Sequence, residues 1–245
     1  MNPIPFETVR ADLLRLRRER AADPMPEVAW LDAEGIEGPE ERLRWLLLRC
    51  ALDQGIGVRL LDRLCSRLRA AAGTEYWGLP APRQAALEEA LRAESALERW
   101  TLARRFCGVG WSAGEFVRSA GSLVSYLRKT PDEALSGLSE GIFWFGRRSE
   151  ERFKGRRFLA LAAAPAPWGL GRARPAGEWS GWTFPLWEGS LEFWSAHRLF
   201  WNTAGERLRR IDVARRLSAL FAEIDPSAPN ELACAARWAA REGVR

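Results

Sequence analysis

The sequence predicts an all-α fold, and three observations carry this prediction. Apolar residues recur at three- and four-residue spacings over long stretches, with arginines on the other face. Alternating, strand-like patterns are nearly absent and β-branched residues are rare. Helix boundary signals also recur, such as Pro39 in a first turn and Gly73 after a last one. The N-terminal helices are expected at 6–20, 39–53, 57–73 and 82–106, the last as one long helix or two joined ones.

The middle of the chain is more punctuated. In FCGVGWSAGEFV, residues 106–117, Gly108 and Gly110 predict a tight turn between two helices. Amides in such a turn can donate to phosphate, although an ordinary helical hairpin has the same pattern. Further on, Thr130, Pro131 and Glu133 have the spacing of a capping box, which predicts a helix start.

A basic helix is expected from about Arg147 to Ala164, followed by a long loop rich in Gly, Pro and Trp over 165–190. Three helices near 191–203, 206–223 and 228–243 close the chain. The length of 245 residues fits one large domain or two small ones. We expect two helical lobes packed as one unit, residues 1–105 and the hairpin-containing residues 106–245.

Composition narrows the class of protein. The net charge of +5 and the pI near 9.5 favour an anionic partner such as nucleic acid. A GC-rich coding sequence would also favour arginine over lysine, and the scarcity of Asn, Gln and Met also suits a thermophilic source. Four scattered cysteines and one histidine predict buried free thiols and no metal site, and no cofactor is expected. Without a signal-like or membrane-length apolar run, we expect a cytoplasmic, nucleoid-associated protein with no membrane partner.

The stretch RRSEERFKGRR, residues 147–157, holds six basic residues and two glutamates. Lys154 within it is one of two lysines in a chain with 37 basic residues. Neighbouring cations make a lysine amine easier to deprotonate, so Lys154 could attack a sugar carbon and form a Schiff base. The alternative is a surface lysine in a solvated charge run.

An aromatic cluster, residues 142–145 (IFWF), comes directly before this basic run. Aromatic rings beside arginines are suited to stacking on exposed bases and neutralising their phosphates. We expect Phe145 in the core and leave Trp144 open between core and base stacking. Trp111 is a second stacking candidate. The expected DNA contacts are Gly108, Gly110, Arg147, Arg148, Arg152, Arg156 and Arg157.

Three stretches of the C-terminal part resemble the helix-hairpin-helix DNA glycosylase superfamily, and most closely its archaeal 8-oxoguanine glycosylase/lyase branch. They are FGRRSEERFK, AHRLFWNTAG and FAEIDPSAPNELACAARWAAREGV. The resemblance implies a two-lobed all-α fold with DNA in a basic cleft. It also implies extrusion of a damaged base and attack on the sugar by Lys154.

One departure concerns the acid of that family. Its aspartate precedes the helix that AHRLFW resembles, where this chain offers Glu188 and Glu192 instead. Asp212 matches the local pattern better but leaves little chain for the terminal helices. The expected acidic partner of Lys154 is therefore Glu192 or Asp212.

The leading expectation is a DNA-binding base-excision protein of the glycosylase/AP-lyase type. One alternative is a non-catalytic nucleic-acid-binding subunit, for DNA or RNA, within a larger nucleoprotein or defence complex. Another is a protein–protein interaction module in which the tryptophan-rich loop docks a partner. The tryptophans of that loop are Trp168, Trp179, Trp182 and Trp187.

Overall fold

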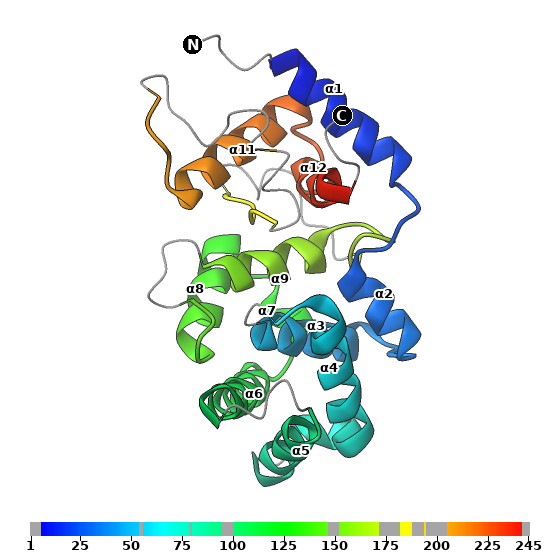
Figure 1. Ribbon diagram of the computed structural model, residues 1–245, viewed down its shortest axis with the longest axis vertical. Coiled ribbons are helices and arrows are strands. Elements are labelled where there is room, and N and C mark those ends of the chain that lie inside the picture. Colours follow the sequence, from blue (N-terminus) through cyan, green and yellow to red (C-terminus); the bar gives the residue numbers. More distant parts are fainter. Residues whose placement is uncertain are drawn as a thin grey trace. The chain divides into compact units, whose positions relative to one another are not determined.

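The computed structural model confirms the all-α class (Figure 1). It describes residues 6–53, 56–78, 80–94, 100–146, 152–171, 182–187, 194 and 205–241, and within these ranges no β-sheet occurs. The chain divides into two compact units. One combines Met1–Met25 with Leu159–Arg245, and the other is Pro26–Phe158. The lobes expected from the sequence follow chain order, whereas these units interleave, and the expected division at 105/106 falls inside a helix.

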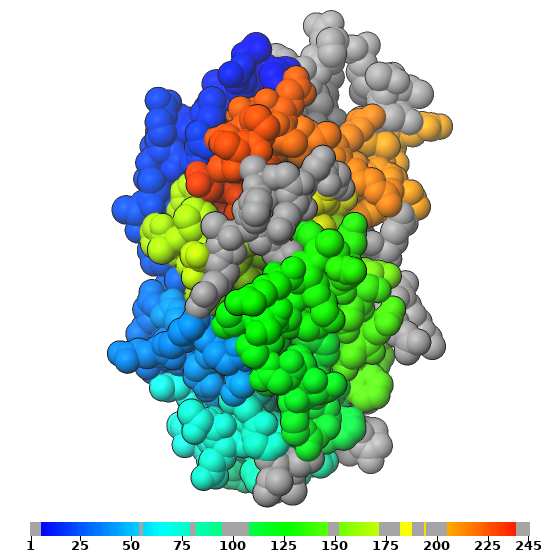
Figure 2. Space-filling model, turned by 180° about the vertical axis from the view of Figure 1, so that it is seen from behind, coloured from blue at the N-terminus to red at the C-terminus, as the bar shows by residue number. Residues whose placement is uncertain are grey.

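The unit that contains both chain ends is built from α1 (Phe6–Glu19), α11 (Arg210–Ile224), α12 (Pro229–Ala235) and η5 (Ala236–Arg241). α12 packs against α1 and α11 (Figure 1), and Figure 2 shows the blue α1 beside the orange and red of these helices. The apolar stripe of α1, with Val9, Leu13 and Leu16, is fully buried. Its burial is the driving force for this packing.

Polar contacts fix the same helices. Arg17 on α1 forms an ion pair of 2.6 Å with Asp225, the residue that ends α11. Hydrogen bonds from Ser227 and from Arg17 hold the pKa of Asp225 at about 2, because they stabilise its charged form. The indole of Trp168 donates to the Arg20 carbonyl and that of Trp187 to the Ala233 carbonyl, at 2.7 and 2.6 Å. Two tryptophans of the expected loop are thus part of the core.

The second unit contains α2 (Pro26–Ala33), α3 (Pro39–Leu52), α4 (Val58–Ala72), η1 (Gly73–Trp77), α5 (Pro80–Arg92), α6 (Trp100–Ala120), α7 (Leu123–Tyr126) and α8 (Pro131–Gly141). It also holds the first residues of α9 (Phe153–Ala163). α3 is its centre, because α2, α4, α6 and α7 all pack against it (Figure 1). Every residue from Trp45 to Leu52 on α3 is buried. Trp45 packs edge-on against Trp30 and Trp77.

The glycine turn expected within 106–117 is wrong, because α6 continues through these residues as one helix. Gly110 allows close packing: an added Cβ would overlap Leu87 on α5 and lie 2.9 Å from the Tyr76 hydroxyl. A Cβ at Gly114 would overlap Arg83 on α5 in the same way. Glycine costs a helix interior about 1 kcal/mol relative to alanine. Here it lets α5 and α6 approach closely.

Other expectations are confirmed with small shifts. The capping box at Thr130 and Glu133 opens α8, with Pro131 in its first turn. Three of the expected N-terminal helices occur as α1, α3 and α4, the stretch 82–106 is divided between α5, which ends at Arg92, and α6, which begins at Trp100, and α2 was missed. The last helix is shorter than expected and continues as η5. The helix expected at 191–203 lies outside the described residues.

Three of the four cysteines, Cys50, Cys65 and Cys234, are free and buried, as expected. Burial raises the pKa of Cys65 and of Cys234 to about 12, because a thiolate loses its hydration there. These thiols are packing residues. The side chain of Cys107 is outside the described set.

Glu40, in the first turn of α3, ties α7 to the centre of this unit. Its carboxylate accepts hydrogen bonds from the main-chain N–H groups of Leu123 and Val124, at 2.8 and 3.0 Å. It also accepts from the side chains of Ser122 and Arg44. Burial by itself would raise the pKa of Glu40, but these four donors outweigh it and lower the pKa below its usual value.

We expect Glu40→Gln to destabilise the protein in a pH-dependent way. A carboxyl whose pKa falls on folding adds stability above its unfolded-state pKa and loses it as pH drops through the folded-state value. The variant should lower the free energy of unfolding by about 1–3 kcal/mol at pH 7. The difference from wild type should shrink below roughly pH 4. Urea unfolding between pH 7 and pH 3 measures both effects.

Glu89→Gln is the matched control, since Glu89 is an exposed glutamate of α5. Its effect should stay within about 0.5 kcal/mol over the whole range. A Glu40→Gln deficit that did not change with pH would contradict the role given to the Glu40 charge.

Candidate functional site

Exposed aromatic side chains lie in the middle of α6 and directly after the end of α8. Among the described residues, four large apolar side chains are exposed, and three of them are Trp111, Phe143 and Trp144. Phe143 is 59% exposed and Trp144 60% exposed, while their neighbours Ile142 and Phe145 are buried. The expectation for Phe145 is therefore confirmed. Trp144, which the sequence left open, lies outside the core.

Hydrogen bonds through Ser112 of α6 fix the backbone next to these aromatic residues. The Phe143 N–H donates to the Ser112 hydroxyl at 3.0 Å, and this hydroxyl donates to the Val109 carbonyl at 2.9 Å. Ser112 is buried and directly follows Trp111 on α6. The bond therefore holds the Phe143 backbone against α6, at the residue that follows Trp111. Figure 2 shows the residues from α6 to α8, in green, as a continuous surface.

Trp144 adopts an unusual backbone conformation. Its φ is +59°, in the left-handed region, which costs a residue with a side chain about 1–2 kcal/mol. Only one other described non-glycine residue, Arg152, shares a positive φ. The protein therefore keeps a large ring exposed on a backbone conformation that lowers stability.

The basic stretch begins next to this strained tryptophan. Gly146 has a φ of +107°, and a Cβ there would lie 3.1 Å from the Arg152 Cα, so the two residues that flank 147–151 are neighbours. Arg152 directly precedes α9 and Arg156 lies in its first turn, where the Arg156 N–H donates to the Arg152 carbonyl at 3.1 Å. Both are partly exposed. We call Trp111, Phe143, Trp144, Arg152 and Arg156 the aromatic–arginine surface.

Lys154 and Arg157 point elsewhere, toward the C-terminal end of α3. The Lys154 amine donates to the Ala51 carbonyl at 2.9 Å. Arg157 pairs with Asp53, the residue that ends α3. The last carbonyls of a helix lack partners within it and carry partial negative charge, so cations stabilise them. These two side chains therefore anchor α9 to α3.

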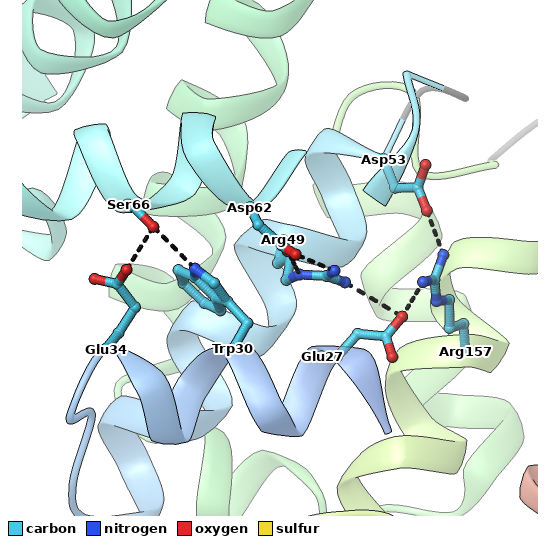
Figure 3. A network of polar contacts seen from close by, with 8 residues as sticks. All are labelled: Glu27, Trp30, Glu34, Arg49, Asp53, Asp62, Ser66 and Arg157. Atoms are coloured by element: carbon cyan, nitrogen blue, oxygen red, sulfur yellow. Dashed lines mark hydrogen bonds and ion pairs between the residues drawn. The ribbon is translucent and has the colours of Figure 1, made fainter. Parts of the chain in front are cut away.

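Arg157 also enters a buried ionic network, drawn in Figure 3. Glu27 on α2 lies between Arg157 and Arg49, and Arg49 contacts it at 3.2 Å. Arg49 further binds Asp62 on α4 through two nitrogens, at 2.8 and 2.6 Å. Glu27 and Arg49 are fully buried, and Arg157 is 6% exposed. The expected phosphate contact by Arg157 is therefore replaced by an internal ion pair.

The remaining predicted residues have different positions. Gly108 and Gly110 lie within α6, where amides are used by the helix itself, so they form no phosphate-binding turn. Asp212 lies on α11, in the unit that does not contain Lys154, and binds Arg209 and Arg215. Bonds from Arg209 lower its pKa. Arg147, Arg148 and Glu192 are outside the described residues, so their roles stay predictions.

Sequence reasoning missed Asp53, a carboxylate at the end of α3. Asp53 follows the carbonyl that Lys154 binds by two residues and pairs with Arg157, one turn further along α9. Nothing in the local pattern around Asp53 distinguishes it from other surface acids. Glu27 was missed for the same reason, because its partners are 22 and 130 positions away in sequence.

No protein-family model, curated protein or solved structure matches this chain. In the part of the chain that the structure describes, no helix is long and apolar enough to cross a bilayer. The same residues contain no group of three or more His, Cys, Asp or Glu side chains arranged to hold a metal ion.

Replacing Glu27 should destabilise the second unit severely. Without this carboxylate, two buried guanidinium groups face each other with less compensating charge, and breaking a buried pair costs about 3–5 kcal/mol. We expect Glu27→Ala to lower the free energy of unfolding by about this amount in urea titrations. The double variant Glu27→Met/Arg157→Met should recover part of the loss, because it removes one buried charge of each sign.

Asp32→Ala provides the comparison within the same helix. Asp32 pairs with Arg42, but 56% of its side chain is exposed, so its loss should cost under about 1 kcal/mol. Equal losses in the free energy of unfolding for Glu27→Ala and Asp32→Ala would contradict the importance given to the burial of the Glu27 network.

Proposed function

We propose that this protein binds nucleic acid through the aromatic–arginine surface. The observation that carries the proposal is the exposure of Trp111, Phe143 and Trp144 together, beside the chain's densest basic stretch. Aromatic faces supply stacking for bases, and guanidinium groups neutralise phosphates. The net charge of the whole chain, +5, also favours an anionic ligand.

Burial of the loop tryptophans weighs against docking of a protein partner on the tryptophan-rich loop. Trp168, Trp182 and Trp187 are 4%, 5% and 3% exposed, so none of them offers an apolar face. Trp179 is outside the described residues. The exposed aromatic area lies instead next to arginines, where charge complementarity favours a polyanion.

The double variant Arg152→Gln/Arg156→Gln tests the phosphate contacts. If each arginine neutralises one phosphate, two fewer counterions are released on binding. The slope of log Kd against the logarithm of the salt concentration should therefore decrease by about 2. Binding at low salt should weaken several-fold. Fluorescence anisotropy with labelled DNA and RNA at 50–300 mM salt gives both quantities.

Arg10→Gln/Arg18→Gln removes the same charge from the exposed side of α1, in the other unit. It should change the slope much less. If both double variants reduced the slope equally, binding would depend on net charge and not on the proposed surface.

A second candidate function is base excision through a Schiff base on Lys154. The supporting observation is that this partly exposed lysine lies in the first turn of α9, between Arg152 and Arg156, with Asp53 at the same end of α3. In an abasic site, the amine nitrogen would add to the sugar aldehyde carbon and release water, giving an imine. The amine must first leave the Ala51 carbonyl and lose a proton, for which Asp53 is the nearest described carboxylate along α3.

Borohydride trapping decides this second function. Wild type incubated with abasic-site DNA should give a covalent adduct on a denaturing gel, and Lys154→Gln should give none. Glutamine can still donate to the Ala51 carbonyl, so the fold should persist.

Lys129→Gln is the control, because Lys129 is the other lysine of the chain and lies over the Tyr126 ring. It should trap like wild type. Equal adducts from both glutamine variants, or none from wild type, would rule out Lys154 chemistry and leave the binding proposal intact.

A further inference from the structure

The conformation of Trp144 bears on which form of nucleic acid the surface accepts. The side chains of Ile142 and Phe145 are both buried in the core, and residues 142–145 form a short excursion of the chain to the surface. Between them Phe143 and Trp144 stay exposed. The Phe145 N–H donates to the Ile142 carbonyl at 3.3 Å, which closes this short excursion. The exposed pair is thus held between two fixed points.

Tight packing of α9 against α8 and Phe145 holds this segment in place. A Cβ at Gly155 on α9 would overlap Leu135 on α8 and lie 3.4 Å from the Phe145 ring. α9 therefore sits directly against the residue that ends the excursion. With the Ser112 bond at Phe143, this fixes the backbone of the aromatic pair from both sides. A left-handed tryptophan persists only where its surroundings determine it, as they do here.

Double-stranded nucleic acid offers few base faces that could stack on these exposed aromatic rings. In double-stranded nucleic acid the base faces are covered by neighbouring bases, and mainly edges and phosphates are accessible. In a single strand the faces can separate and stack on aromatic side chains, while a basic groove or row follows the backbone. Arg152, whose Cα lies close to Gly146, and Arg156 in the first turn of α9 provide two such cations near the segment that carries the strained tryptophan.

We propose that the aromatic–arginine surface is a binding site for single-stranded nucleic acid, with an unpaired base stacked on Trp144. The inference rests on the proposed nucleic-acid binding and adds the class of ligand. It requires neither a particular base sequence nor Lys154 chemistry, because every base has a π face.

The test compares one labelled 20-nucleotide sequence as single-stranded DNA, as single-stranded RNA and as blunt duplex DNA at equal salt. Wild type should bind at least one of the single strands about ten-fold more tightly than the duplex. Trp144→Gly should weaken single-strand binding about ten-fold and leave duplex binding nearly unchanged. Glycine adopts positive φ readily, so the variant should keep a melting temperature close to that of wild type.

Two further variants sharpen the result. Trp144→Phe keeps an aromatic face and should retain most of the single-strand affinity. Val58→Ala shortens an exposed apolar side chain at the start of α4 that is not part of the aromatic–arginine surface, and should change nothing. The DNA and RNA arms also show which sugar the site prefers.

The outcomes separate the two proposals. Equal affinity for single strand and duplex, or an unchanged single-strand affinity in Trp144→Gly, would overturn this inference while nucleic-acid binding stands. Absence of binding to every ligand at 50 mM salt would reject the proposed function itself, and this inference with it. A folded Trp144→Gly variant that loses single-strand binding alone supports it.

Discussion

The buried Glu27 carboxylate is the constraint on which the second unit depends. A charged side chain that is buried away from water is tolerated only where oppositely charged partners surround it. Glu27 has Arg49 on one side and Arg157 on the other (Figure 3). Through them it joins α2 to α3 and α9, and Arg49 extends the network to Asp62 on α4. Apolar packing holds these helices together, but this network specifies their register. A rotated α9 would leave buried charges without partners.

This constraint divides the basic stretch into two faces. Arg157 and Lys154, three residues apart, turn toward the end of α3 and neutralise its carbonyls and Asp53. Arg152 and Arg156, at the N-terminal end of α9, remain partly exposed, and Arg152 lies close to Gly146, two residues after the strained Trp144. Charges of one sign and similar sequence context therefore have opposite roles. The inward pair holds the helix so that the outward pair has a fixed position beside the aromatic residues.

The sequence predicted features that depend on local chemistry. The capping box at Thr130, the burial of Phe145 and the helical class each follow from a few neighbouring residues. It failed where the cause is distant. Gly108 and Gly110 have the pattern of a turn, yet α6 runs through them, and Gly110 instead lets the distant residues Leu87 and Tyr76 pack closely against this helix. α2 was missed because it is short and buries residues on several sides, including Glu27, so it lacks a clear amphipathic period.

By itself the sequence determined the all-α class, most helix positions and the candidate surface at residues 142–157, because periodicity, capping and composition are local properties. Only the tertiary structure decided which basic residues face outward and which serve the core. That choice depends on Glu27 and Asp53, which are remote from residue 157 in sequence and adjacent to it in space. Electrostatic pairing in a dry interior is a property of the packed chain. No local pattern carries it.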